Sequence, residues 1–454
     1  MNLEKIRNEK VKMILQFSIP SIIAMVLTAM ITVVDGFFMG NYVGTSAIAA
    51  VNIGLPIIYL FLGVGLMISV GGVAIAGIAY GAGDIDKSKQ VFNQTMITVF
   101  IASIILTAIS AGGMKFIVHI LRVDRLLAEY FIDYYSIILI YLPIMIINAS
   151  FGMFIRSEGE PQYFMKVTIL NLLLNIVLDY VCVKYLNLGV KGIALASLVS
   201  TLVCLLAILH FFMNKSHIYK LGKFKFSSEI FRKTILNGAS EFIGEISLAI
   251  SIFAYNFVIM KYVGSNGISA FAVVGYLSYV FNMIIIGFGQ GLVPLVGFAY
   301  GGKDINLARS LRRTTNKIVT GVGFTVFILV LITSKMYSRI FVDEVQVQMM
   351  IEKGMIIYAS SFLFLGINTI SSFYFTSIGR AKESAIISAA RGLIILVINI
   401  SIFPMLFGMT GVWLISPVTE ITTLVISIYF IMQEKNYVKK EKQKSVEEYG
   451  EMKI

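Results

Sequence analysis

The sequence has few charged residues for its length. Aspartate, glutamate, lysine and arginine make up 14% of its 454 residues, whereas a soluble globular domain carries about 25%. Hydrophobic residues make up 57% of the chain, and the mean hydropathy is +0.86. This composition excludes an ordinary soluble domain, and we expect the lipid bilayer to be the main partner of the protein surface.

Cysteine and histidine are also scarce. Cys182 and Cys204 lie inside apolar runs without the spacing of metal ligands, and we interpret them as packing residues. The sequence has no GxxxxGKS/T phosphate loop, no GxSxG motif and no cluster of cysteine and histidine. We therefore expect no cofactor and no enzyme activity, and any energy that the protein uses should come from an ion gradient.

The sequence does contain many long apolar runs. A run of about 18 or more apolar residues is long enough to cross a bilayer as a helix. Two of the runs, the second and the eighth, are long enough to be tilted or broken. The pattern predicts an all-α integral membrane protein with twelve transmembrane helices, near residues 13–38, 47–78, 91–113, 132–154, 163–183, 190–213, 234–259, 268–298, 314–334, 354–376, 384–407 and 410–432.

The two halves of the chain repeat each other at an offset of 220 residues. Tyr42-Val43-Gly44 recurs as Tyr262-Val263-Gly264. A chance similarity would not hold its register over a long span, so we predict two homologous six-helix bundles. Because six spans return the chain to the same side, the repeat is parallel, with its axis along the membrane normal. Further pairs at this offset are Tyr59 and Tyr279, Gly71 and Gly291, Gly77 and Gly297, and Asn148 and Asn368.

Basic residues are distributed unevenly between the predicted spans. Of the 37 lysines and arginines, 27 lie at the N-terminus, in every second gap or in the C-terminal tail. The positive-inside rule then predicts a multi-pass protein of the cell membrane, inner or plasma, with both termini cytoplasmic. It also accounts for the net charge of +12 without a nucleic-acid partner. The expected domains are a bundle over 1–213, a linker over 214–233, a bundle over 234–432 and a charged cytoplasmic tail over 433–454 without defined structure.

Polar residues inside the spans are the candidates for function, because a charge at mid-bilayer costs about 2.5–3.5 kcal/mol. Span one carries Asp35. Span five carries Asn171, Asn175 and Asp179 at steps of four, which places these three on one helical face. Such a face must contact protein or water. Interhelical hydrogen bonding is the alternative to a functional role, and it is the preferred interpretation for Asn171.

The second half carries a different set of polar residues. Span seven holds Glu241 and Glu245, of which Glu245 lies deeper in the membrane. Arg391 in span eleven is expected to pair with Glu420 in span twelve, or else to extend to the membrane surface. The candidates for a substrate cavity or a second ion site are Asn148, Glu245, Asn256 and Gln290.

These residues resemble those of the multidrug and toxic-compound extrusion (MATE) family. Residues 34–40, Val-Asp-Gly-Phe-Phe-Met-Gly, are similar to the family's Asp-x-x-Phe-Ile-Gly turn. Residues 155–161 look like its loop after span four, and residues 175–179 and 189–197 match its signature in spans five and six. Residues 240–256 resemble the branch of the family that has a glutamate in span seven.

The resemblance covers about residues 10–432 and has clear implications for function. It implies that Asp35, Asn175, Asp179 and Ser197 form a cation or proton site, with Na⁺ at Asp35 and Asp179 as one form of it. It also implies a drug cavity between the bundles that opens to each side in turn. The expected function is secondary active export, in which a monomer exchanges amphipathic, mostly cationic, drug-like organic compounds for H⁺ or Na⁺.

A lipid-linked saccharide flippase of the same superfamily is the nearest alternative. Flippases commonly add spans or line their cavity with cationic residues, and few basic residues lie away from the span ends in this sequence. A major-facilitator transporter also has two parallel six-span halves, but its basic signature is missing between spans two and three. An intramembrane enzyme would need a catalytic cluster, and the sequence shows none.

Overall fold

The computed structural model describes residues 1–120 and 124–451 of the chain, and within them it contains helices and no strand. The elements are α1 (Leu3–Asn8), α2 (Lys10–Tyr42), α3 (Thr45–Ile53), α4 (Leu55–Gly81), α5 (Ile85–Ile120), α6 (Arg125–Glu158), α7 (Pro161–Tyr180), the π-helix η1 (Val181–Tyr185), α8 (Gly189–Asn214), α9 (Ser228–Tyr262), α10 (Ser265–Gly301), α11 (Ile305–Phe341), α12 (Val345–Ala359), α13 (Phe362–Ser377), α14 (Ala381–Ala389), the π-helix η2 (Ala390–Ile394) and α15 (Ile395–Glu451).

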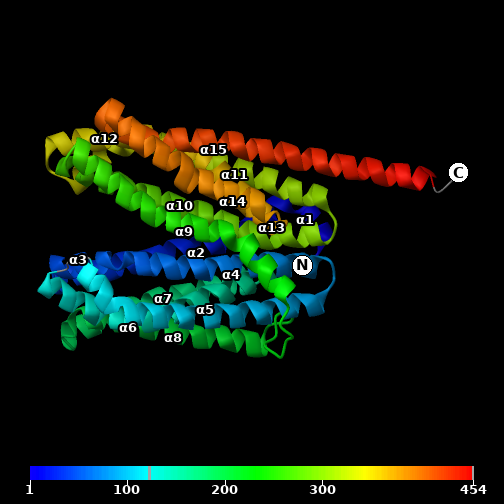
Figure 1. Cartoon of the computed structure of the whole chain (residues 1–454), viewed down its shortest axis with the longest axis horizontal. Coiled ribbons are helices and arrows are strands. Elements are labelled where there is room, and N and C mark those ends of the chain that lie inside the picture. The colour runs from blue at the N-terminus through cyan, green and yellow to red at the C-terminus, as the bar shows by residue number, and fades with distance from the viewer. Residues whose placement is uncertain (121–123, 452–454) are drawn as a thin grey trace.

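The helices form two bundles that lie side by side (Figure 1). One bundle contains α2 to α8, and the other contains α9 to α15. The two chain termini lie at the same end of the molecule, which we call the terminal end. This placement is what an even number of membrane crossings requires.

The described part of the chain contains twelve spans. Ten helices are long and apolar enough to cross a membrane, and α12 with α13 forms an eleventh span that is bent by 45°. One of the ten, over residues 381–436, contains two spans, because the chain turns back within it (Figure 1) and the helix is interrupted at Gly408. Gly408 has φ 55° and ψ −134°, which lie outside the helical region. The predicted membrane fold of two six-helix bundles is confirmed.

The two spans that were long enough to be broken behave differently. The second is broken at Gly54, between α3 and α4, and Pro56 follows in the first turn of α4, a position that proline favours because the N–H it lacks would have no helical partner there. The eighth is the single helix α10, which continues through Pro294.

The tenth span is bent although the sequence predicts one helix there. At the break, the Ser360 hydroxyl donates to the Ile357 carbonyl and the Ser361 hydroxyl donates to the Tyr358 carbonyl, both at 2.6 Å. Hydroxyls that bond back to carbonyls of the preceding turn compete with the backbone ladder and bend helices. The bend therefore has a local chemical cause.

The bundles meet through helix pairs that the repeat relates: α2 packs on α10, and α4 packs on α9. A Cβ atom on Gly71 would lie 2.0 Å from the Thr234 carbonyl oxygen, and one on its repeat partner Gly291 would lie 2.7 Å from Ser18 Cα. Small residues at these positions allow the two backbones to approach closely.

An internal two-fold axis runs between Gly77 and Gly297. These repeat partners face each other, and a Cβ on Gly77 would lie 3.8 Å from Gly297 Cα. Near them, Gly81 lies against the backbone of α10, and its repeat partner Gly301 lies against the backbone of α4. These contacts join the bundles near the terminal end, and they confirm that the repeat is parallel.

The short helix α1 contacts both bundles at the terminal end. The Met1 ammonium donates to the Tyr80 hydroxyl at 3.0 Å, and Arg7 pairs with Asp304 at 2.7 Å. Burial alone would raise the pKa of Asp304, but hydrogen bonds from Arg7 and the Leu307 N–H outweigh it, so the pKa lies below its ordinary value. The pair is therefore charged at neutral pH.

The loop between the bundles is shorter than the predicted linker. It covers residues 215–227, because Ser227 caps α9 by accepting from the Ile230 N–H. The loop is held to the first bundle, where Glu158 of α6 accepts from the Ser216 hydroxyl at 2.7 Å.

The charged tail is helical as far as Glu451, whereas the sequence predicts a segment without defined structure. Lysine, glutamate and glutamine favour helix, and Arg309 pairs with Glu434 at 2.9 Å at the start of the extension. Residues 452–454 of the predicted tail lie outside the described residues.

Candidate functional site

Three helices of the first bundle bring Asp35, Asn175 and Ser197 into contact. Asp35 lies on α2, Asn175 on α7 and Ser197 on α8. Asn175 Nδ2 donates to Asp35 Oδ1 at 3.1 Å and to Ser197 Oγ at 3.2 Å. The Ser197 hydroxyl donates to Asp35 Oδ2 at 3.1 Å. Both carboxylate oxygens of Asp35 are therefore held by side chains from other helices.

Asp179 lies one turn after Asn175 on α7 and completes the cluster. Its side chain is fully buried, and neither of its carboxylate oxygens accepts from an N–H or hydroxyl group of the described residues, but the carboxyl of Asp35 lies within hydrogen-bonding reach. The Oδ1 atom of Asn175 is also buried without a partner. The carboxylate of Asp179 interacts electrostatically with that of Asp35. The structure thus brings together the four residues that the sequence singled out.

This arrangement is stable only with added positive charge. Two ionised carboxylates in a buried site repel each other strongly, and buried oxygens without donors are costly. A proton on one carboxylate removes the repulsion. Na⁺ is a hard cation, and the unpartnered oxygens of Asp179 and Asn175 are ligands of the type that hard cations take. The donor set therefore fits either H⁺ or Na⁺.

Two tyrosines of α6 face the cluster, and the sequence analysis did not identify them. Tyr134 is buried and interacts electrostatically with Asp35 and Asp179, and Tyr141 interacts with Asp35. They are separated by seven residues, which places them on one face of a helix. That spacing is the signal in the sequence, but it is weak in a chain with 22 tyrosines.

The second bundle has no carboxylate at the equivalent positions. The repeat partner of Asp35 is Tyr255, and that of Asp179 is Asn399. Both partners are buried, and Asn399 Nδ2 donates to Thr419 Oγ1 at 2.9 Å. The carboxylate pair is therefore specific to the first bundle.

One arginine and one glutamate inside the second bundle form an ion pair instead. Arg391 Nε donates to Glu420 Oε1 at 2.5 Å, which confirms the predicted pair, and Arg391 Nη1 donates to Thr369 Oγ1 at 2.8 Å. Asn368 Nδ2 donates to Glu420 Oε2 at 2.8 Å. The positive charge of Arg391 and the negative charge of Glu420 therefore balance each other without a bound ion.

The four candidates for a cavity or second ion site do not form one cluster. Asn148 is buried in the first bundle, where its Nδ2 donates to the Thr201 carbonyl at 2.9 Å. Asn256 is exposed on α9. Glu245 and Gln290 both lie between the bundles, but among the described residues no hydrogen bond joins any two of these four.

Glu245 lies where α9 crosses α4. A Cβ atom on Gly63 of α4 would lie 3.4 Å from Glu245 Cβ. The repeat partners Tyr59 and Tyr279 both interact electrostatically with Glu245, and so does Glu241. Two carboxylates and two aromatic rings, contributed by both bundles, thus lie near the internal axis.

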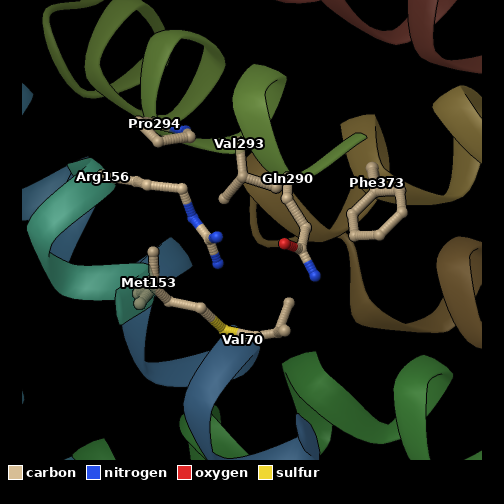
Figure 2. Close-up of a pocket in the computed structure, with 8 residues that line it drawn as sticks. Val70, Met153, Arg156, Gln290, Val293, Pro294 and Phe373 are labelled. Carbon is tan, nitrogen blue, oxygen red and sulfur yellow. The ribbon is translucent and has the colours of Figure 1, made fainter. Parts of the chain in front are cut away.

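Gln290 lines a pocket between the bundles together with Arg156 (Figure 2). Arg156 lies in the last turn of α6 and is 2% exposed. The sequence analysis placed Arg156 in the segment that looks like the family's loop after span four and assigned it no role, because the sequence does not show that the end of α6 is covered by the second bundle. The pocket is lined by Val70, Val73, Met153, Arg156, Gln290, Val293, Pro294 and Phe373.

Comparison with known proteins agrees with this architecture. The sequence model of the MatE family matches residues 20–181 and 242–401, one segment in each bundle. The multidrug export protein MepA of Staphylococcus saprophyticus is 24% identical over 404 residues, which cover 88% of this chain and 89% of that protein. The protein of the same name from Staphylococcus haemolyticus is 22% identical over 440 residues, which cover 96% of each chain.

Solved structures share the fold at low sequence identity. A structure described as the outward-facing conformation of a multidrug resistance MATE family transporter has a TM-score of 0.90 and 22% identity, over 94% of this chain and 96% of that chain. A MOP superfamily transporter from Pyrococcus furiosus has a TM-score of 0.88 and 22% identity, over 94% and 96%. Because the family match spans more than half of the sequence, this multi-pass membrane protein belongs to the MatE family of multidrug export transporters.

Proposed function

We propose that the protein is a secondary active multidrug exporter that exchanges amphipathic, mostly cationic organic compounds for H⁺ or Na⁺. The observation that carries the proposal is the buried cluster of Asp35, Asn175, Asp179 and Ser197, in which neither carboxylate forms an ion pair with any described residue and Asp179 accepts from no N–H or hydroxyl donor there. A carboxylate pair inside a membrane is expensive unless an ion is bound there during the cycle.

The coupling step follows from the electrostatics of the cluster. When H⁺ or Na⁺ binds, the repulsion between Asp35 and Asp179 falls, and α2, α7 and α8 can pack more closely around the site. When the ion leaves, the repulsion returns and favours a different packing. A charge that crosses the whole membrane potential contributes about 2.3 kcal/mol per 100 mV, which is enough to bias such a two-state switch.

The two bundles provide the moving parts. In this structure they are joined near the terminal end through Gly71, Gly77, Gly291 and Gly297. Separation of these contacts would open the cargo pathway at that end. We place the terminal end on the cytoplasmic side of a cell membrane, because the basic residues concentrate at that end.

The cargo is proposed from the groups between the bundles. Glu241 and Glu245 supply negative charge, and Tyr59 and Tyr279 supply aromatic faces, a combination that attracts organic cations. The MepA relatives carry the name multidrug export protein, in agreement with a broad cargo range. One chain supplies both bundles, so the proposed cycle needs no second copy, no cofactor and no nucleic acid, and it changes no covalent bond.

Efflux of ethidium from energised cells tests the proposal. We expect efflux that stops when a protonophore or a sodium ionophore collapses the coupling gradient, and that is lost in an Asp179→Asn variant present in the membrane at normal amounts. The matched control is Asn399→Ala at the repeat-equivalent buried position, which should export normally. Imposed H⁺ or Na⁺ gradients in proteoliposomes then identify the ion.

Coupled export by Asp179→Asn would refute the site assignment. A well-inserted wild-type protein that exports no organic cation would favour the alternative, a lipid-linked saccharide flippase with the same fold.

A further inference from the structure

We propose that the pocket between the bundles binds an anionic group on Arg156, facing Gln290 (Figure 2). The chemical class is a small anion or a carboxylate. It has two sources: a free inorganic ion, or a carboxylate carried by a zwitterionic cargo. The second source rests on the proposed export function, and the first does not.

Arg156 is a buried cation without a counter-charge in the described part of the chain. It is 2% exposed, its Nη1 atom is buried without an acceptor, and it forms no ion pair there. Its recorded contact is with the face of the Phe164 ring at 4.9 Å. An unpaired buried charge destabilises a protein, so this protein gains stability when an anion occupies the space in front of the guanidinium.

Two other arginines enclosed by the helices, the buried Arg312 and the partly exposed Arg391, each have a counter-charge nearby. Arg391 pairs with Glu420. Arg312, which is 5% exposed, also has one buried nitrogen without an acceptor and lies over the Tyr374 ring at 5.1 Å, but it interacts electrostatically with Glu434. Arg156 therefore differs from residues of the same type in the same protein, and this difference favours a ligand over a merely structural role.

The pocket has the polarity and the size for an anion. The guanidinium of Arg156 and the carboxamide of Gln290 point toward each other across it, and the other lining residues are apolar. The Gln290 oxygen is buried without a donor, and rotation of the carboxamide would present its N–H groups to an anion instead. The cavity volume is about 20 Å³, a little more than a single water molecule needs, so the space suits one small group and not a drug-sized ligand.

The position of the pocket connects anion binding to the transport cycle. Arg156 belongs to the first bundle and Gln290 to the second. Val73 of the lining lies one turn before Gly77, and Val293 lies one turn before Gly297, so the pocket adjoins the contact on the internal axis. An anion held by both side chains would stabilise the state in which the terminal end is closed.

The test is the melting temperature of the purified full-length protein in detergent at constant sodium and ionic strength. The starting buffer contains a bulky sulfonate as the anion, which is then replaced by chloride or by acetate. We expect at least one of the two to raise the melting temperature by about 3 °C or more at saturation. Chloride alone would identify an inorganic ion, acetate alone a carboxylate, and a response to both a general anion site.

Three variants separate this site from general salt effects. Arg156→Gln should lose the shift, whereas Arg312→Gln, the matched buried arginine, should keep it. Gln290→Glu places a carboxylate opposite Arg156, so its melting temperature in the sulfonate buffer should already equal that of the anion-bound wild type, and added anion should change it no further.

Three results would each overturn the proposal: a wild type that is indifferent to both anions, an Arg156→Gln variant that still responds, or a Gln290→Glu variant with no gain in sulfonate buffer. The measurement does not involve export. Asp179→Asn should keep the anion shift, so a failure of the proposed transport function would leave this result intact.

Discussion

At the scale of single residues, the repeat places different chemistry at equivalent positions. Asp179 and Asn399 are repeat partners, yet Asp179 has no hydrogen-bond donor while Asn399 donates to Thr419. Charge in the second bundle occurs instead as the Arg391–Glu420 pair. The carboxylate pair of the first bundle can therefore respond to an ion, whereas Glu420 in the second bundle already has Arg391 as its counter-charge.

The sequence was sufficient to find Asp35 and Asp179, because a carboxylate in an apolar run is conspicuous. It was not sufficient to find Arg156, Tyr134 or Tyr141. Their importance depends on which helix faces them, and spacing along one chain does not contain that information.

Removing one member of the Arg391–Glu420 ion pair should lower the stability of the protein more than removing both members. Glu420→Gln leaves the charge of Arg391 uncompensated, and we expect it to destabilise the protein by about 3 kcal/mol, the lower end of the range for a buried pair because Arg391 is 25% exposed. Adding Arg391→Met removes that charge and should recover most of the loss. Thermal unfolding in detergent measures the stability of the single and the double variant. Equal melting temperatures for the single and double variants would show that the pair is not an isolated unit.

At the scale of helices, the irregular segments occur where polar residues lie. The π-helix η1 begins two residues after Asp179, and the π-helix η2 contains Arg391. These segments belong to spans five and eleven, which the repeat relates. π-helical turns are frequent at functional sites, but they have no composition of their own. The sequence therefore predicted the spans and could not predict these distortions, nor the bend at Ser360 and Ser361.

The contact between α4 and α9 should not tolerate the addition of a single methyl group at Gly71. In Gly71→Ala the new Cβ would lie 2.0 Å from the Thr234 carbonyl oxygen, so the helices must separate, at a cost of about 1–3 kcal/mol. The matched control is Gly112→Ala on α5, where no atom lies within 4 Å of the new Cβ. We expect a lower melting temperature and slower export for the first variant and neither for the second. An unaffected Gly71→Ala variant would mean that the bundles are not tightly apposed there.

At the scale of the whole molecule, the repeat determines how the bundles meet. The offset of 220 residues predicted two equivalent halves, and the contacts between Gly71 and α9 and between Gly291 and α2 show that equivalent faces are used on both sides of the axis. Which faces these would be did not follow from the sequence, because every span is apolar on most of its surface. A symmetric contact of this kind can separate without distorting either bundle.

A single engineered disulfide between the two bundles should prevent them from separating at the terminal end. Gly77 and Gly297 are close enough for a disulfide between cysteines placed there, since a Cβ on either lies within 3.8 Å of the other backbone. In a background with Cys182→Ser and Cys204→Ser, we expect oxidation of Gly77→Cys/Gly297→Cys to stop ethidium export, and reduction to restore it. Each single cysteine variant should export equally well before and after oxidation. If the cross-linked protein still exports, the terminal end does not open during the cycle, and access must alternate by movement within the bundles instead of between them.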